Sequence, residues 1–546
     1  MLTTLEGAAV AKALRRHIHC RLNSGDGLTM ADINGAQSLL STFVDAGVEV
    51  CFTNPGTSEM HFVAALDKEP GMRAILGLFE GVVTGAADGY GRMAGKPACT
   101  LLHLGPGLAN GLANLHNARR ARTPIVNVVG EHATYHRKLD APLTSDIQGF
   151  ASPVSGWIHV SESADTVAAD AARAIQASMQ PPGQIATLIL PADTAWNPAS
   201  GAAQPLRPQA LTSANAESIE SSIRALVSGK PCALLINGLG VTDAGLRLAS
   251  RIAQKTGARL LGDTFIGRIP RGAGRVDLGR LPYFAEQAEE ALAGVEHLIL
   301  VDTKAPVSFF AYPGRASELT PTGCQVHPLA MPGEDVIAAL EAVVEGVGAA
   351  GIKPTFAELK RPELARGELT PVTIAQALGA LMPEHAVVVN EAATSGFAIP
   401  GLTANSAPHD WLDLTGGAIG MGLPAAVGAA VACPDRRVLT LQGDGAGMYT
   451  VQALWTMARE NLDVTVVLFA NRKYAILQVE FMRVGAHNPG PKAMGMLDLS
   501  HPDLNWVDMA KGMGVPGRRV TDTAGFNSAL AESLATPGPF VIEAMV

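Results

Sequence analysis

An aspartate enclosed by two glycines is the residue of this 546-residue chain whose surroundings most clearly indicate chemistry. Asp444 lies in the turn Gly443-Asp444-Gly445, and Asn471 ends the next apolar run along the chain. Carboxylate and amide oxygens are hard ligands of the kind that Mg²⁺ prefers. An isolated Gly-Asp-Gly is most often an ordinary turn, so the pairing with Asn471 carries the metal hypothesis.

The segments around Asp444 and Asn471 should place both side chains at one edge of a sheet. Residues 437–442 are typical of a buried parallel strand, residues 450–460 of a helix, and residues 464–471 of a second strand. A glycine-rich turn before a helix offers unpaired N–H groups and the positive end of the helix dipole to an anion. Because Asp444 would repel a phosphate there, a divalent cation is needed between the two. The pattern therefore predicts a site for Mg²⁺ and a phosphate group.

These residues resemble the cofactor motif of the thiamine-diphosphate-dependent enzymes, in which Gly-Asp-Gly is followed further on by Asn-Asn. The chain departs from the motif at the first Asn, where it has Ala470, and keeps the second, which is the metal ligand in that family. The resemblance implies that Asp444, Asn471 and the main-chain carbonyl of Lys473 hold Mg²⁺, with thiamine diphosphate completing the shell. The further cofactor-binding candidates in the turn are Gly445 and Ala446.

Glu80 follows the apolar run 74–78 and begins an alanine- and glycine-rich helix. By itself, a carboxylate in the first turn of a helix is an ordinary residue that the helix dipole favours. The segment 80–97, however, resembles the helix that carries the catalytic glutamate of the same family. The resemblance implies that Glu80 shares a proton with N1′ of the aminopyrimidine and so promotes loss of the proton at C2 of the thiazolium. A carboxyl group in an apolar pocket suits that role.

His103 ends the strand-like segment 98–103 and lies just before Gly105-Pro106-Gly107, after which a helix is expected over 108–119. A single His at a strand end is more often structural than catalytic. Its position resembles that of an active-site histidine in benzoylformate-decarboxylase-like members, whereas acetolactate synthases usually carry a small polar residue there. By the same resemblance Thr57 is a second substrate-side candidate.

The segment 305–314 resembles the loop that carries a second active-site histidine in benzoylformate decarboxylase, but it contains no His. That absence counts against a pure aryl-decarboxylase assignment. In the last third of the chain, Thr394 follows an expected strand and could donate to a phosphate. The resemblance implies that the Gly417 carbonyl accepts from the aminopyrimidine and that Ile419 lies under the bent cofactor. Glycine allows the backbone to approach a ring so closely.

Strand-like and helix-like segments alternate along the chain, which predicts an α/β fold of parallel sheets with helices on both faces. We expect three doubly wound domains and two further segments: a pyrimidine-binding domain (33–195), a central Rossmann-like domain (214–348), a pyrophosphate- and Mg²⁺-binding domain (370–546), a linker (349–369) and an N-terminal extension (1–32). The turn Gly238-Leu239-Gly240 in the central domain lacks the third glycine of a dinucleotide fingerprint, which counts against FAD. The resemblance leaves a FAD-dependent member as an alternative, because some members of the family keep FAD in this domain.

Composition narrows the class of protein. A net charge of −9 argues against a nucleic-acid partner, and 47% apolar residues with 58 Gly and 35 Pro describe a globular enzyme with many turns. The six scattered cysteines have no metal-ligand spacing, which favours buried thiols in a cytoplasmic protein. The uncharged segment 415–433 is long enough to span a membrane, but its glycines and Pro424 favour a cofactor loop that runs into a core helix.

The expected function is decarboxylation of a 2-oxo acid that depends on thiamine diphosphate and Mg²⁺, followed by addition of the enamine to a second carbonyl, as in acetolactate synthase. Simple decarboxylation, as in benzoylformate decarboxylase, is one alternative, and a non-catalytic subunit of the same fold is another. The resemblance also implies a homodimer or homotetramer, because in this family the glutamate and metal domains that share one cofactor belong to different subunits.

Overall fold

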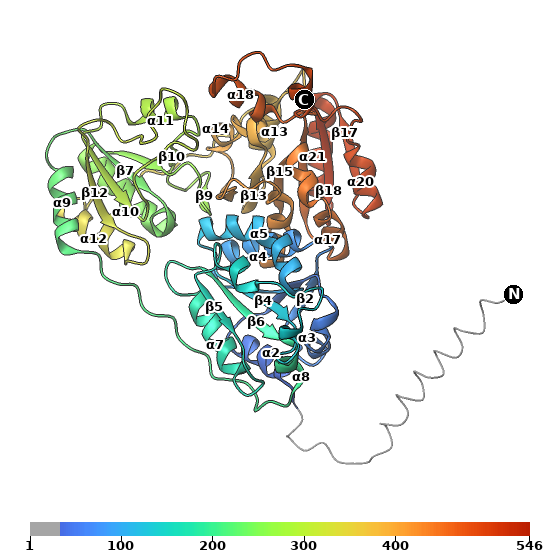
Figure 1. The fold of residues 1–546 in the computed structure, drawn as a ribbon. Coiled ribbons are helices and arrows are strands. Elements are labelled where there is room, and N and C mark those ends of the chain that lie inside the picture. The colour runs from blue at the N-terminus through green and yellow to red at the C-terminus, as the bar shows by residue number, and fades with distance from the viewer. Residues whose placement is uncertain (1–32) are drawn as a thin grey trace, which may run out of the picture.

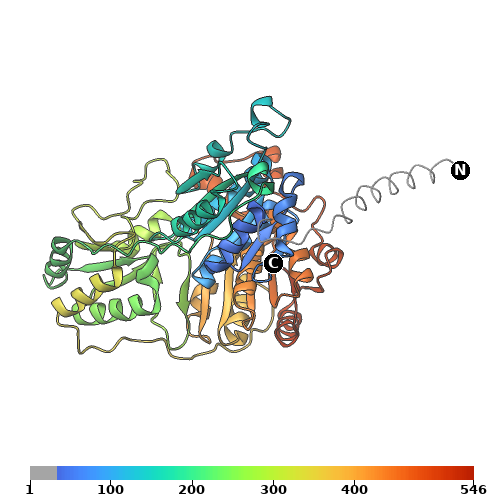
Figure 2. The ribbon, with the colours of Figure 1, turned by 90° about the horizontal axis from the view of Figure 1, so that it is seen from below.

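The computed structural model describes residues 33–546, so the expected extension 1–32 lies outside the described residues. Three β-sheets with flanking helices build three α/β units (Figure 1), and the central unit lies to one side of the other two (Figure 2). This arrangement confirms the expected fold class. No helix within the described residues is long and apolar enough to cross a membrane.

The first sheet has the strand order β2-β1-β3-β4-β6-β5, and all its pairs are parallel. Because β1 pairs with both β2 and β3, the order reverses there, and the loops that follow β1 and β3 lie side by side. The strands are β1 (Val50–Thr53), β2 (Arg73–Leu76), β3 (Ala98–Leu102), β4 (Ile125–Glu131), β5 (Trp157–Val160) and β6 (Ile185–Pro191). The helices are α2 (Gly35–Asp45), α3 (Met60–Leu66), α4 (Glu80–Ala94), α5 (Leu104–Ala121), α6 (Ile147–Ala151), α7 (Val167–Ser178) and α8 (Ala192–Trp196).

The second sheet, in the central unit, has the order β10-β8-β7-β11-β12 and is also parallel. Its inner strands β7 and β11 are fully buried, as their apolar sequences require. The strands are β7 (Cys232–Ile236), β8 (Arg259–Gly262), β10 (Gly279–Arg280), β11 (His297–Val301) and β12 (Gln325–Ala330). The helices are α9 (Ala216–Leu226), α10 (Asp243–Thr256), α11 (Ala285–Leu292) and α12 (Val336–Gly346).

The third sheet has the order β17-β18-β16-β15-β13-β14-β9 and reverses between β13 and β15. Its edge strand β9 (Ile269–Arg271) is antiparallel to β14 and comes from the stretch expected to belong to the central domain. The other strands are β13 (Ala386–Glu391), β14 (His409–Asp413), β15 (Val438–Gly443), β16 (Val464–Ala470), β17 (Gly517–Val520) and β18 (Phe540–Met545). The helices are α13 (Pro371–Leu381), α14 (Ile399–Thr403), α15 (Gly422–Ala432), α16 (Asp444–Gly447), α17 (Ala453–Arg459), α18 (Ala475–Arg483), α19 (Pro491–Gly495), α20 (Trp506–Gly512) and α21 (Thr523–Ala535).

Two helices differ from expectation. The helix expected over 108–119 begins at Leu104, which has a left-handed φ of 49°, so the Gly-Pro-Gly sequence lies inside the first turn. Proline is accommodated in a first turn because the N–H it lacks would have no helical partner there. The helix expected over 450–460 is shorter, since α16 and a 3₁₀ turn (Met448–Thr450) precede α17.

The first and third units meet where α4 crosses α15, and α4 and α5 lie at this junction (Figure 1). The uncharged segment 415–433 forms a loop and then the buried helix α15, as expected. A Cβ on Gly89 would lie 2.0 Å from the carbonyl oxygen of Ala425, and a Cβ on Gly428 would lie 1.8 Å from that of Ala86. The two helices therefore touch through their backbones, which only glycine permits.

His409, the first residue of β14, makes the stability of the third unit depend on pH. Burial lowers the pKa of His409 to about 4, and its Nε2 is buried without a hydrogen-bond partner. The unfolded chain, with a histidine pKa of about 6.5, binds the proton more readily, so the free energy of unfolding should decrease as the pH falls below about 6.5, by about 3 kcal/mol in all. Urea unfolding of wild type and His409→Asn between pH 8 and pH 4 measures this, and equal pH slopes in the two proteins would contradict the assignment.

Candidate cofactor and active site

Asp444 lies at the carboxyl end of β15, in the first residue of α16. Its side chain is buried; Oδ1 accepts from the N–H of Gly445 at 2.8 Å and Oδ2 from the N–H of Arg472 at 2.6 Å. The second bond brings the turn after β16 against the carboxylate. Burial raises the pKa of Asp444, the usual consequence of removing a carboxylate from water.

The turn that meets Asp444 contains the other two expected metal ligands. Asn471 Oδ1 accepts from the N–H of Lys473 at 3.1 Å, and Arg472 between them has a left-handed φ of 56°. A carboxylate, an amide oxygen and a backbone carbonyl thus belong to two adjacent turns, and this donor set fits Mg²⁺. The described residues hold no cluster of three His, Cys, Asp or Glu side chains suited to a metal. Ala470, where the family motif has Asn, is buried at the end of β16.

The glycine loop before α15 contacts the residues that follow Asp444, since the Thr450 hydroxyl donates to the Gly420 carbonyl at 2.9 Å. Gly417 has a φ of +74°, and Ile419 is partly buried in the same loop. A residue that sequence reasoning missed, Glu391, holds the loop: its buried carboxylate accepts from the N–H groups of Gly420, Met421 and Gly422 at 2.8–3.0 Å. Gln442 Nε2 donates to it as well, at 2.8 Å, yet burial still raises the pKa of Glu391. The sequence feature that could have identified Glu391 is its position as the last residue of an apolar strand, β13.

Thr394 and Gly445 complete the expected binding residues of the third unit. Thr394 lies in a 3₁₀ turn (Ala393–Gly396) after β13 and is partly exposed, beside the reversal point of the sheet. A Cβ on Gly445 would lie 2.4 Å from the ring of Tyr474, so a larger residue in this turn would have to displace that ring. Ala446 follows it within α16 and is buried.

Glu80 begins α4 at its first residue and is 9% exposed. Its Oε2 accepts from Asn110 Nδ2 of α5 at 3.0 Å. The carboxylate is therefore largely buried at the edge of the first unit and is held there by an amide of α5.

His103, after β3, is paired with a carboxylate that sequence reasoning missed. Its Nδ1 lies 2.9 Å from Glu59 Oε2 and 3.3 Å from Ser58 Oγ. The reversal of strand order between β1 and β3 brings these loops together, although the two residues are 44 positions apart. Glu59 is buried and also accepts from the N–H of Gly56 at 2.9 Å. Thr57 is exposed at the start of this turn, and the hydrogen bonds to His103 come from the two residues that follow it.

The segment 305–314 presents aromatic side chains where a histidine had been considered. The ring of Phe309 lies 2.9 Å from the position of a Cβ on Gly417. It packs against Tyr283 and Phe310, with ring centroids at 5.1 and 4.8 Å. An aromatic cluster thus borders the glycine loop.

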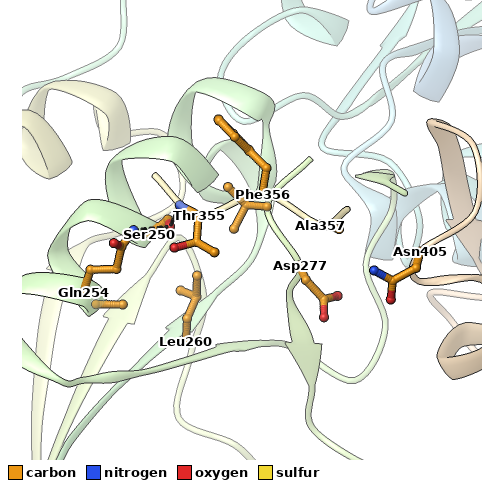
Figure 3. A pocket seen from close by; sticks show the side chains of 10 residues that line it. Ser250, Gln254, Leu260, Asp277, Thr355, Phe356, Ala357 and Asn405 are labelled. Atoms are coloured by element: carbon orange, nitrogen blue, oxygen red, sulfur yellow. Dashed lines mark hydrogen bonds between the residues drawn. The ribbon is translucent and has the colours of Figure 1, made fainter. Parts of the chain in front are cut away.

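In the central unit, the turn of Gly238 is filled by the chain itself. Asp302 accepts from the N–H of Leu239 at 2.7 Å and forms an ion pair with Arg122 from the end of α5. The backbone donor that would face a dinucleotide phosphate is therefore used internally. A cavity of about 380 Å³ lies elsewhere, between α10, the linker and the third unit (Figure 3). None of the expected site residues lines that cavity, whose wall includes Ser250, Gln254, Leu260, Asp277, Phe356 and Asn405.

Comparison with known proteins decides the family. The family description "Thiamine pyrophosphate enzyme, N-terminal TPP binding domain" matches residues 33–153, and "Thiamine pyrophosphate enzyme, C-terminal TPP binding domain" matches residues 392–544. The chain belongs to the thiamine pyrophosphate enzymes. These two ranges contain Glu80 and His103 in the first and Asp444 and Asn471 in the second.

Relatives within this family have different names. A Mycobacterium tuberculosis protein provisionally named acetolactate synthase large subunit IlvX is 55% identical over 94% of this chain and 99% of its own length. Benzoylformate decarboxylase of Pseudomonas aeruginosa is 28% identical over 91% of this chain and 96% of its length. The structure of the thiamine diphosphate-dependent 4-hydroxybenzoylformate decarboxylase of Rhodococcus jostii RHA1 superposes with a TM-score of 0.80, at 22% identity, over 94% of this chain and 99% of that one.

Proposed function

We infer that the chain is a decarboxylase of 2-oxo acids that uses thiamine diphosphate and Mg²⁺. One observation carries the proposal: the N–H of Arg472 donates to the buried Asp444, which brings the turn with Asn471 and the Lys473 carbonyl to that carboxylate. When bound, thiamine diphosphate supplies the carbanion that adds to the 2-oxo group and takes up the electrons released with CO₂.

The candidate site residues fall into two groups, one for each end of the cofactor. Asp444, Asn471 and the Lys473 carbonyl would hold Mg²⁺ and through it the diphosphate, while Thr394, Gly445 and Ala446 line that end. At the other end the Gly417 carbonyl would accept from the aminopyrimidine and Ile419 would support the bend. Glu80, largely buried, would hold the proton shared with N1′.

His103 bears on which product is released. Because Glu59 engages Nδ1, the imidazole is held in one orientation, and Nε2 has no protein partner among the described residues. An oriented imidazole can give a proton to the carbon that has lost CO₂, which ends the reaction as an aldehyde. Addition to a second carbonyl compound is the other candidate, supported by the 55% identity to a relative with an acetolactate synthase name.

Glu59→Gln should separate these two outcomes. We expect aldehyde formation to fall by about 10- to 100-fold, since an amide no longer offers a carboxylate to His103 Nδ1 and so orients the imidazole less firmly, while CO₂ release falls less. Product analysis by chromatography beside CO₂ measurement tests this, with Glu131→Gln, a buried carboxylate at the end of β4, as control. An unchanged ratio of aldehyde to CO₂ would remove His103 from the product-forming step.

The assembly proposed is a homodimer or a pair of homodimers, since Glu80 would serve a cofactor bound by another subunit's third unit. FAD is not part of the proposal, because Asp302 already uses the turn where its phosphates would bind. The proposed setting is the cytoplasm, and the proposed partners are small 2-oxo acids.

The test begins with cofactor binding. Purified protein with Mg²⁺ should bind thiamine diphosphate, seen as thiochrome fluorescence after oxidation, and should release CO₂ from at least one member of a panel of 2-oxo acids. EDTA should abolish both. Binding without CO₂ release from any substrate would favour a non-catalytic subunit, and failure to bind would refute the proposal.

A further inference from the structure

Three asparagines form a stripe along one face of α5. Asn110, Asn114 and Asn117 are four and three positions apart, the spacing that places side chains on one face of a helix. Asn114 and Asn117 are almost completely buried, at 2% and 0% exposed. Buried amides destabilise a fold unless they are hydrogen-bonded, so the partners of these two define what the stripe does.

The partners lie on α4 and on the glycine loop before α15. Asn114 Nδ2 donates to the carbonyls of Gly81 at 2.8 Å and Gly420 at 3.2 Å. Asn117 Nδ2 donates to Asn114 Oδ1 at 3.0 Å and to the Ala418 carbonyl at 2.8 Å, and its Oδ1 accepts from the N–H of Ala418 at 3.2 Å. Both protons of each amide are thus used, and they link three separate segments.

The same contacts hold the two groups that should act on the aminopyrimidine. Gly81 follows Glu80 on α4, and Asn110, the exposed end of the stripe, donates directly to Glu80 at 3.0 Å. Ala418 follows Gly417, so the two-way bond to Asn117 determines where the Gly417 carbonyl points. The Thr415 hydroxyl also donates to the main chain of Asn117, at 2.7 Å.

We propose that Asn114 and Asn117 are positioning residues that lock the 416–420 loop to the helix carrying Glu80, so that the two cofactor sites of a homodimer are mechanically coupled. The inference rests on the proposed function. In that assembly, the Glu80 and the Gly417 of one chain serve different cofactors, and the stripe is a hydrogen-bonded connection between them within one chain.

Only an amide satisfies these contacts. An aspartate at 117 would present oxygens to the Ala418 carbonyl and to Asn114 Oδ1, where donors are required. An alanine would leave the Ala418 N–H and carbonyl without their partner in a buried place. Asn117→Ala therefore releases the loop without adding a charge.

The first experiment compares Asn117→Ala with Asn127→Ala, which removes an equally buried asparagine of β4 that bonds to Thr100 and Thr187 instead. Thermal unfolding measures how much stability each variant loses, so that effects on function can be compared at a known loss of stability. Thiamine diphosphate is then titrated in Mg²⁺ and followed by tryptophan fluorescence. For Asn117→Ala alone we expect affinity and kcat to fall at least about tenfold, with KM for the 2-oxo acid little changed. Asn110→Ala, at an exposed position, is a second variant that keeps the fold and should lower kcat alone.

The second experiment isolates the coupling in mixed dimers purified by two affinity tags. One chain carries Glu80→Gln and the other Asn117→Ala. The remaining active site then uses the Glu80 of the Asn117→Ala chain and the glycine loop of the other chain, whose Asn117 is intact. We expect its kcat to be at least about threefold below that of a dimer of Glu80→Gln with wild type, because the broken stripe lies on the Glu80 side.

The outcomes separate the inference from the function on which it rests. Equal rates in the two mixed dimers, or equal effects of Asn117→Ala and Asn127→Ala on binding and kcat, would overturn the coupling while leaving the enzyme assignment in place. Wild-type protein that neither binds thiamine diphosphate nor releases CO₂ would overturn both.

Discussion

Glu80→Gln should lower kcat by about 10²- to 10⁴-fold, the range expected when a group that transfers a proton is removed. The amide matches the carboxylate in shape and can still meet Asn110, so the fold and the melting temperature should not change. Glu80 is proposed to contact the aminopyrimidine, whereas Mg²⁺ and the diphosphate are proposed to bind at the Asp444 turn. Mg²⁺-dependent binding of thiamine diphosphate should therefore weaken much less than turnover.

The measurement is steady-state CO₂ release together with a thiamine diphosphate titration. Glu49→Gln, which removes an exposed carboxylate of the same unit, is the matched control. Exchange at C2 of the bound thiazolium, followed by NMR after transfer to D₂O, should slow in parallel with kcat. Wild-type exchange and turnover in Glu80→Gln would remove the residue from the mechanism.

Asp444→Asn should weaken Mg²⁺-dependent binding of thiamine diphosphate by at least about 100-fold, because it removes the only charged ligand of the three expected ones. In the apo protein the amide keeps one of the two backbone hydrogen bonds of Asp444, and removal of a charge that burial disfavours offsets loss of the other, so the melting temperature should change little. Loss of cofactor binding without loss of stability is the signature of a ligand rather than of a structural residue.

Thermal unfolding with and without cofactor measures both effects. In wild type, thiamine diphosphate and Mg²⁺ at about 100 times the dissociation constant should stabilise the fold by about 2.7 kcal/mol, and this gain should vanish in Asp444→Asn. Asp503→Asn provides the control, because Asp503 is exposed and lies 3.7 Å from the Arg472 guanidinium, outside the turn itself. A stabilisation equal to that of wild type in Asp444→Asn would contradict the metal site.

Local sequence patterns were enough to predict three of the candidate site residues. Asp444, Asn471 and Glu80 each lie where an apolar strand gives way to a turn or helix, and that alternation also predicted the three sheets. Glu59, Glu391 and the asparagine stripe escaped it, because their roles depend on which strands become neighbours. His103 meets Glu59 only because β1 pairs with β3, and nothing in the residues between them states that pairing.

The predicted start of α5 was wrong for a similar reason. Gly105-Pro106-Gly107 has the composition of a turn, but these residues form the first turn of α5, where glycine packs close to His103 and Glu80. A Cβ on Gly107 would lie 3.3 Å from the His103 side chain and 3.4 Å from Glu80 Oε1. Tertiary proximity, rather than helix propensity, selected the residues.

The glycine contacts between α4 and α15 also limit how this enzyme can be redesigned. With neighbouring carbonyl oxygens 2.0 Å and 1.8 Å from a Cβ at positions 89 and 428, a combinatorial library gains nothing by varying either residue. The border of the glycine loop offers more scope, because Phe309 and Phe310 are 41% and 51% exposed in the single chain. If the chain acts on 2-oxo acids as proposed, directed evolution toward new substrates should therefore diversify residues 305–314 and leave the helix crossing untouched.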